Sequence, residues 1–265
     1  MLKVLFTNQI QLGLAQAGVA AALALLVILL ARGRGIHLEV ETLVAMVRGL
    51  VQIVLVGAVL LLLLRSPRWI GALLLVPMML AAGGISARRA KEIPGAFKIS
   101  ALAIAAGAGL VIALMTLLGV IDVGITSLVP VGSMLIANAM NTNGLTLNRI
   151  RADVLAHTGE IETALSLGAS ANAAVAPYMQ ASYQASLIPA IDSLRSLGIV
   201  WIPGLMAGML LSGARPVYAA IYQFVVLAMI FAASGLTSLV STIMVRGNLF
   251  SAADQLLLQP GAARS

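Results

Sequence analysis

The chain has 265 residues and a formal net charge of +7; 61% of its residues are hydrophobic, 9% are charged and none is cysteine. Soluble domains contain about 25% charged residues, so this chain lacks the polar residues needed to cover a soluble fold of its length. The absence of cysteine excludes disulfides, thiolate metal sites and a cysteine nucleophile.

Four apolar segments in the first half of the chain predict transmembrane helices, each of which needs about 20 residues to cross a bilayer. They cover residues 9–31, 41–64, 69–86 and 99–121. The first is longer than the apolar part of a signal peptide, which has about 7–15 residues, so we expect it to be retained as a span. The segments do not alternate like barrel strands, which indicates helices.

The second half of the chain is less uniform. A span over 125–146 is interrupted by asparagines, a polar segment follows over 149–186, and further spans are predicted over 187–211 and 217–243. The expected fold is therefore an all-α integral membrane protein. It has a bundle of about seven transmembrane helices in a single transmembrane domain over 1–265.

Small residues recur within these spans. One patch covers 105–109, and a second consists of Gly204, Ala207, Gly208 and Gly213. Small side chains let membrane helices approach closely, so both patches are interpreted as helix-packing surfaces.

Lysine and arginine indicate how the spans are oriented, because cytoplasmic loops are enriched in them. With seven spans, the poorer side holds Lys3, Arg65, Arg68 and Arg215. The richer side holds Arg32, Arg34, Arg88, Arg89, Lys91, Lys98, Arg149, Arg151, Arg246 and Arg264. We therefore expect a multi-pass protein of the cell inner membrane with its N-terminus outside and its C-terminus in the cytoplasm. This placement explains the basic charge, and no nucleic acid partner is expected.

The polar segment 149–186 is predicted to contain a short helix over 160–167 that ends at Gly168, since glycine tolerates the left-handed conformation that closes a helix. A second helix is predicted to begin after Ser170 and to continue into the next span. A short helix lying across the cytoplasmic face suits docking to a soluble partner.

The pattern Glu162-Thr163-Ala164, followed by three residues and Gly168, resembles the EAA-type loop of ABC transporter permeases, with threonine in place of the first alanine. In that superfamily the loop forms a coupling helix that sits in a cleft of the ATP-binding subunit. The resemblance implies that Glu160, Glu162, Ala164 and Gly168 form an ATPase-coupling helix.

Other short motifs occur in a fixed order over residues 40–245. They are Arg88-Arg89-Ala90-Lys91, 94–100, 138–141, 147–149, 164–169, 186–189 and 197–204. The ordered set resembles the FetB (YbbM) family of ABC transporter permeases, a family described as iron exporters and related to a plant aluminium-tolerance permease. Trp201 and Thr142-Asn143 depart from the family pattern, and the latter changes the polar residues near the expected path.

The resemblance implies a permease subunit that exports a metal ion such as iron, with ATP hydrolysed by a separate ABC ATP-binding subunit. The chain agrees, because it has no Gly-x-x-x-x-Gly-Lys-Ser/Thr loop to bind phosphates. It is therefore expected to be non-catalytic and to bind no cofactor itself, with ATP and Mg in the partner subunit. A homodimer of the permease in the lipid bilayer is also implied.

Polar side chains inside spans are costly and mark candidate transport paths. Arg48 and Gln52 lie four residues apart in the second span. Arg48 lies near the end of its span, so it can also reach the headgroups or pair with Glu39 or Glu41. Gln52 is deeper and is expected to face the bundle interior.

The fifth span supplies the other path candidates. Asn138 and Asn141 share a helix face and offer hard oxygen ligands, while the thioether of Met140 suits softer metals. The alternatives are hydrogen bonds between helices and simple gap filling. The two histidines, His37 and His157, lie far apart and form no His-Glu-x-x-His motif, so no metal site is assigned.

Pro203 and Gly204 interrupt the sixth predicted span, where proline removes a helix hydrogen bond. They are interpreted either as a hinge that passes partner movement into the bundle or as a static kink. Other functional hypotheses are a stand-alone secondary transporter or channel, and an ABC permease for a non-metal solute. An intramembrane enzyme is disfavoured because no catalytic motif lies at membrane depth.

Overall fold

The computed structural model describes residues 9–35, 39–63, 67, 69–251 and 255–258. These residues are almost all helical, and the β-structure among them is limited to isolated bridges at Leu197–Trp201 and Phe250–Leu256. The chain forms two compact units, Met1–Ser66 and Pro67–Ser265, which are called unit 1 and unit 2 and are treated separately.

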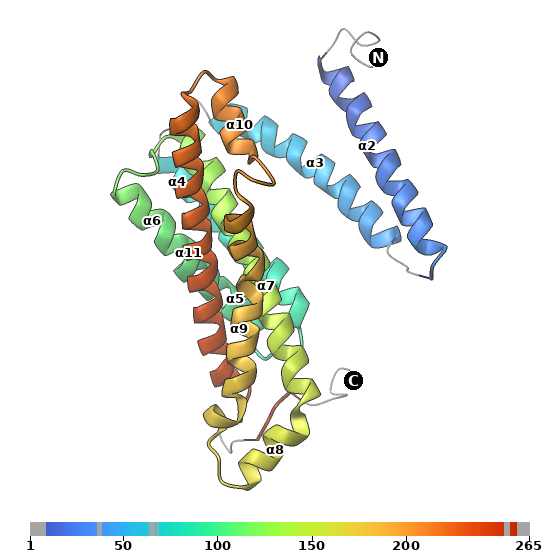
Figure 1. Ribbon diagram of the computed structural model, residues 1–265, viewed down its shortest axis with the longest axis vertical. Helices are drawn as coiled ribbons and strands as arrows, with labels where there is room; N and C mark the ends of the chain where they lie inside the picture. Colours follow the sequence, from blue (N-terminus) through green and yellow to red (C-terminus); the bar gives the residue numbers. More distant parts are fainter. Residues whose placement is uncertain (1–8, 36–38, 64–66, 68, 252–254, 259–265) are drawn as a thin grey trace. The chain divides into compact units, whose positions relative to one another are not determined.

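Unit 1 contains two long apolar helices, α2 (Gln9–Arg32) and α3 (Glu39–Leu63), which contact each other (Figure 1). The two predicted spans in this part of the chain are therefore confirmed as helices. Lys3, Arg65 and Arg68, which the orientation argument used, lie outside the described residues.

Unit 2 begins with α4 (Trp69–Ala87), which ends in the short 3₁₀ helix η1 (Arg88–Ala90). A turn then leads into a second long helical stretch made of α5 (Ala96–Ile104), the π-helical segment η2 (Ala105–Gly109) and α6 (Leu110–Leu117). These elements match the predicted third and fourth spans, although the second stretch begins and ends a few residues earlier than expected.

The rest of unit 2 contains α7 (Ile125–Ala156), α8 (Thr158–Ser166), α9 (Ala171–Ser196), α10 (Gly204–Leu211) and α11 (Pro216–Asn248). The long helices α7, α9 and α11 pack against one another, with the short α8 joining one end of α7 to α9 (Figure 1). The predicted seventh span is confirmed as the helix α11.

Two predicted spans differ in extent from the helices of the structure. The helix α7 continues past the expected end of the fifth span at residue 146, without a break, to Ala156. No continuous helix covers the predicted span 187–211, since α9 ends at Ser196 and α10 starts only at Gly204. Gly198 has a positive φ of 74° within the interruption, and Pro203, which has no N–H, precedes α10.

Five helical stretches of the described chain are long and apolar enough to cross a membrane, so the chain is a multi-pass membrane protein. They are Ile10–Arg32, Thr42–Val59, Trp69–Ala90, Ala96–Leu117 and Pro216–Asn248. The predicted number of seven is not confirmed, because α7 and α9 carry too many polar residues to meet the same requirement.

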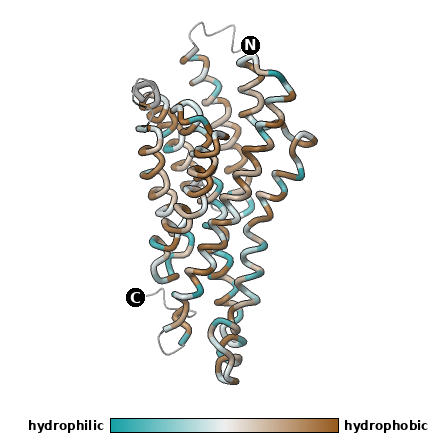
Figure 2. Tube along the Cα trace, turned by 90° about the vertical axis from the view of Figure 1, so that its left-hand side faces the viewer, coloured by the Kyte–Doolittle hydropathy of each residue, from teal (hydrophilic) through white to brown (hydrophobic). Residues whose placement is uncertain are grey.

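Two clusters of apolar side chains form the core of unit 2. One joins α4, η2, α6, α7 and α11 and includes Leu135 and Val226, both fully buried. The other lies where α7, α8 and α9 meet the residues after α11, and includes Ile161 and Leu249. Hydrophobic residues predominate along the long helices, as Figure 2 shows.

The first small-residue patch does bring helices together. A Cβ atom on Gly107 would lie 1.9 Å from Thr237 Oγ1 and 2.8 Å from the carbonyl oxygen of Ala233, so η2 and α11 touch through backbone. The second patch behaves differently, because a Cβ atom on Gly204, Gly208 or Gly213 meets no described atom within 4 Å. The packing role predicted for the second patch is therefore not found within the described chain.

Candidate functional site

The short helix α8 lies at one end of unit 2, where the chain turns back from α7 to α9. Gly168 has a φ of 88°, and the N–H of Ala169 donates to the carbonyl oxygen of Ala164 at 3.0 Å, which closes the helix as the sequence predicted. The helix α9 then starts directly after Ser170, whose Oγ accepts from the N–H of Ala173 at 3.3 Å.

Side-chain contacts hold α8 against α9. The Tyr178 hydroxyl donates to Glu160 Oε2 at 2.7 Å, and its ring stacks on His157 with centroids 4.6 Å apart. The hydrogen bond to Glu160 raises the pKa of Tyr178 above its usual value, because ionisation would place two negative groups in contact. Ile161 of α8 is fully buried and packs into one of the two apolar clusters of unit 2. The position of α8 is therefore set by specific contacts.

The outer face of α8 is open. Glu162 and Gly168 are exposed, Ala164 is half-buried, and 83% of the Leu167 side chain surface is accessible. Of the four residues assigned to the coupling helix, Glu160 thus faces Tyr178 while Glu162 and Gly168 are available to a partner.

Further polar contacts hold the same end of unit 2. Arg151 on α7 donates from both Nε and Nη2 to the carboxylate of Glu92, the latter bond being 2.8 Å, and Ser182 donates to Asp153 Oδ2 at 3.0 Å. The hydrogen bond from Arg151 lowers the pKa of Glu92, and the same bond raises the pKa of Arg151. The turn between α4 and α5, which contains Glu92, therefore lies at the α8 end of unit 2.

The packed interior of unit 2 also contains a group of buried polar side chains that we call the hydroxyl core. It consists of Ser86, Ser100, Asn143, Thr146, Ser186, Ser234, Thr237, Ser238 and Ser241. Ser238 Oγ lies 2.8 Å from Thr146 Oγ1 and 2.9 Å from Ser186 Oγ, which links α11 to α7 and α9. Asn143 Nδ2 donates to Ser86 Oγ at 2.8 Å and links α7 to α4.

Part of the hydroxyl core has no hydrogen-bond partner among the residues that the structure describes. The atoms concerned are Asn143 Oδ1 and the hydroxyl oxygens of Ser100, Ser234, Thr237 and Ser241. Buried polar atoms normally have a hydrogen-bond partner, so such a group in an apolar bundle is a candidate site for a polar ligand. Sequence reasoning missed it, although the α11 members recur at helical spacing within an apolar span, which is a readable signal.

The predicted path residues are distributed over both units. Asn138 and Met140 are half-buried on α7 and Asn141 is exposed there, while Arg48 and Gln52 are exposed on α3 of unit 1. The Asn138 amide donates to the Met134 carbonyl oxygen at 2.8 Å within its own helix, which differs from the interhelical bond considered above. The alternative pairing of Arg48 with Glu39 or Glu41 involves side chains outside those described.

The predicted hinge residues do not kink a continuous helix. Pro203 precedes the first residue of α10, Gly204, and the whole stretch from Leu197 to Pro203 separates α10 from α9. The side chain of Gln223, buried on α11, accepts a bond from the N–H of Met206 at 3.2 Å. The sequence placed the interruption correctly but underestimated its extent.

A cavity of about 440 Å³ opens beside α10, which is the size of a small-ligand pocket. The residues that line it include Asp122, Thr126, Ser127, Met209, Tyr218 and Tyr222. Asp122 Oδ1 accepts from the N–H of Gly124 at 3.2 Å, and no ion pair of Asp122 occurs among the described residues. Within the described chain, no cluster of three or more His, Cys, Asp or Glu side chains could chelate a metal.

Comparison with known proteins identifies relatives along nearly the whole chain. A family model described as "Uncharacterised protein family (UPF0014)" matches residues 14–250. The chain is 33% identical to the rice UPF0014 membrane protein STAR2 over 253 residues, which cover 95% of this chain and 88% of STAR2. It is 30% identical to the Arabidopsis thaliana protein ALUMINUM SENSITIVE 3 over 92% of this chain and 90% of that protein.

A bacterial relative has a name that states an activity. The Escherichia coli "Probable iron export permease protein FetB" is 31% identical over 222 residues, which cover 83% of this chain and 86% of FetB. No solved structure gives a significant match.

Proposed function

The chain belongs to the UPF0014 family of membrane proteins, and from that premise we propose that it is the permease subunit of an ABC transporter that exports a metal ion such as iron. ATP and Mg bind a separate ATP-binding subunit in this proposal, and two permease subunits form the membrane part. The relative FetB supplies the export activity and the metal, since its name states both.

The observation that carries the proposal is the geometry of α8. It is a short helix with an exposed outer face, closed by Gly168 and fastened to α9 through Tyr178 and Glu160. A partner that pushes on Glu162 or Leu167 would move α9 directly, because the contact between α8 and α9 is a specific one. This is the mechanical requirement of a coupling helix.

The proposal includes membrane crossings by α7 and α9, which gives seven in total. Some of their polar residues, namely Asn143, Thr146 and Ser186, are buried against α4 or α11, and polar residues are tolerated at membrane depth when they face other helices. The α8 end of unit 2 is assigned to the cytoplasm, because it carries Arg88, Lys91 and Arg149.

The path proposed for the ion runs along the polar face of α7 through the hydroxyl core. Asn138, Met140 and Asn141 remain candidates there. Arg48 and Gln52 on α3 of unit 1 remain separate candidates from the sequence pattern. Hydroxyl and amide oxygens bind a cation more weakly than carboxylates do. Weak binding suits a transport path, because an ion must be able to leave each site that it enters. The Asp122 cavity offers a negatively charged mouth at the α10 end.

The assembly test is co-purification of an ATP-binding subunit with the full chain. We expect Glu162→Lys and Gly168→Trp each to reduce both assembly and transport-coupled ATPase activity at least several-fold. Matched controls are Asp192→Lys, a charge reversal of an exposed acid on α9, and Gly213→Trp, at another left-handed glycine with φ 89°.

Several outcomes would contradict the coupling role. They are normal assembly and ATPase activity of both α8 variants, or equal losses in the controls. Ion flux in vesicles that lack any ATPase would favour the stand-alone transporter or channel instead. Unchanged iron accumulation in cells without the chain would remove iron from the proposal and leave another solute.

A further inference from the structure

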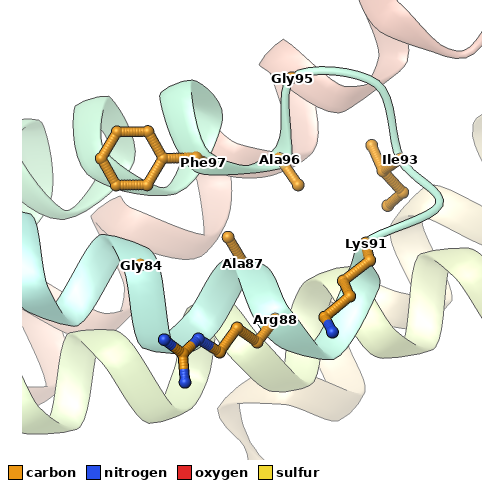
Figure 3. A pocket seen from close by; sticks show the side chains of 8 residues that line it. All are labelled: Gly84, Ala87, Arg88, Lys91, Ile93, Gly95, Ala96 and Phe97. Carbon is orange, nitrogen blue, oxygen red and sulfur yellow. The ribbon is translucent and has the colours of Figure 1, made fainter.

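An open groove lies at the α8 end of unit 2, between the end of α4 and the start of α5. Its volume is about 410 Å³, and its wall includes Arg88 and Lys91 together with Ile93, Ala96 and Phe97 (Figure 3). Gly95, with a φ of 73°, turns the chain back so that the first turn of α5 faces the last turn of α4. The groove is thus built from one tight helix connection.

The groove carries two positive charges for which the described part of the chain provides no counter-ion. Arg88 and Lys91 are exposed, and neither forms an ion pair among the described residues. Glu92 is adjacent in sequence, but its carboxylate accepts both bonds from Arg151 and is therefore engaged by another cation. The wall of the groove contains no acidic residue.

The apolar residues of the groove wall suit a position at the boundary between the hydrocarbon region and the lipid headgroups. The groove joins the candidate spans Trp69–Ala90 and Ala96–Leu117, so it lies where the hydrocarbon region gives way to headgroups. Ile93 and Ala96 are buried, whereas Phe97 is 55% exposed. Two cations and an exposed aromatic ring on the wall of one groove match an amphipathic ligand.

We propose that this groove binds the headgroup of an anionic phospholipid, with its phosphate on Arg88 and Lys91 and its glycerol region against Phe97. Basic pockets beside transmembrane helices on the cytoplasmic side are suited to anionic headgroups. A lipid is favoured over an acidic protein surface, because the groove is small and partly apolar and lies at the ends of two spans. The proposal does not depend on the transported substrate or on the ATPase.

The test uses the full chain purified in detergent, titrated with phosphatidylglycerol or phosphatidylcholine and analysed by native mass spectrometry. We expect preferential binding of phosphatidylglycerol. Each basic residue near a membrane surface contributes about five-fold in affinity, so the double variant Arg88→Gln/Lys91→Gln should bind about 25-fold more weakly. The variant Phe97→Ala should also weaken binding, although it leaves the charge unchanged.

The matched control is Lys98→Gln/Arg149→Gln, which removes the same charge from the same end of unit 2 outside the groove. It should retain at least most of the phosphatidylglycerol affinity. Two results would overturn the proposal. Equal losses in the control and the groove variant would indicate diffuse charge, and displacement of the lipid by inorganic phosphate would indicate a free-phosphate site.

Discussion

The contact of η2 with α11 and the contact of α8 with α9 both join neighbouring helical segments, but different forces hold them. The first is a backbone approach at Gly107, inside the apolar spans, with the side chain of Thr237 directly against it. The second is a hydrogen bond and a stacked ring pair at the polar end, through Tyr178. The interior contact should therefore respond to added volume, and the polar-end contact to lost hydrogen bonds and to pH.

The largest expected effect comes from adding one methyl group to the interior contact. In Gly107→Ala the new Cβ would overlap Thr237 Oγ1 and approach backbone atoms of α11, which cannot move away as a flexible side chain can. Overpacking of this kind costs about 3 kcal/mol at the upper end of its range. Thermal unfolding in detergent should show a clear decrease in the melting temperature.

The control for this variant is Gly109→Ala in the same π-helical segment. Its Cβ would meet Met79 Sδ at 3.6 Å, which is ordinary van der Waals contact with a flexible side chain. Equal melting temperatures for the two variants would contradict a steric interior contact.

A smaller effect is expected from Ser238→Ala in the hydroxyl core. The change removes the bonds to Thr146 and Ser186 and leaves their hydroxyls to find other partners. Side-chain hydrogen bonds between membrane helices average about 0.6 kcal/mol each, so the loss should be about 1 kcal/mol. The control is Ser212→Ala, which removes only hydrogen bonds to the backbone of α10 and should leave the melting temperature unchanged. A similar decrease in both variants would argue that Ser238 does not hold the helices together.

The polar-end contact should weaken in Tyr178→Phe, which keeps the ring against His157 but removes the bond to Glu160. A hydrogen bond of this type contributes about 0.5–1.5 kcal/mol, and partial exposure places this one at the lower end. Amide hydrogen exchange should become faster in α8 but not in η2. Tyr183→Phe on the same helix is the control, and unaltered exchange in α8 would show that Tyr178 does not hold it.

The smallest effect is a dependence on acid pH through Glu92 and Arg151. Because the pKa of Glu92 is lowered in the folded chain, its contribution is present above the unfolded value, about 4.5, and is lost as the pH falls through the folded value. Glu92→Gln should therefore reduce the loss of stability between pH 5 and pH 3, measured by thermal unfolding. An identical acid dependence in the wild type and the variant would exclude this pair as its source.

Several features of the fold were predictable because local chemistry decides them. The long apolar runs gave the positions of α2, α3, α4 and α11 closely, and the short helix before Gly168 was placed within two residues at its start. Glycine at 168 is informative because a left-handed helix end favours it strongly.

The interruption between α9 and α10 was less predictable. An apolar sequence such as 197–202 satisfies the hydropathy of a span whether or not it is helical, so hydropathy alone extended the helix through it. The hydroxyl core could not be predicted from local sequence either. The amide of Asn143 is buried against Ser86, which is distant in sequence, and only the packing of α7 on α4 brings the two together.

Three properties followed from the sequence alone. The chain is a membrane protein, its polar segment contains a short helix that ends at Gly168, and it resembles one family of permeases. Composition and single-residue preferences are sufficient for these conclusions, since they concern transfer into lipid and local backbone conformation. In unit 2, tertiary structure decided which side of each apolar helix faces inward. Lipid tails are as apolar as leucine side chains, so the hydrophobic effect does not decide which face of a membrane helix is buried. In this chain the close approach at Gly107 and the hydrogen bonds of Ser238 define the interior.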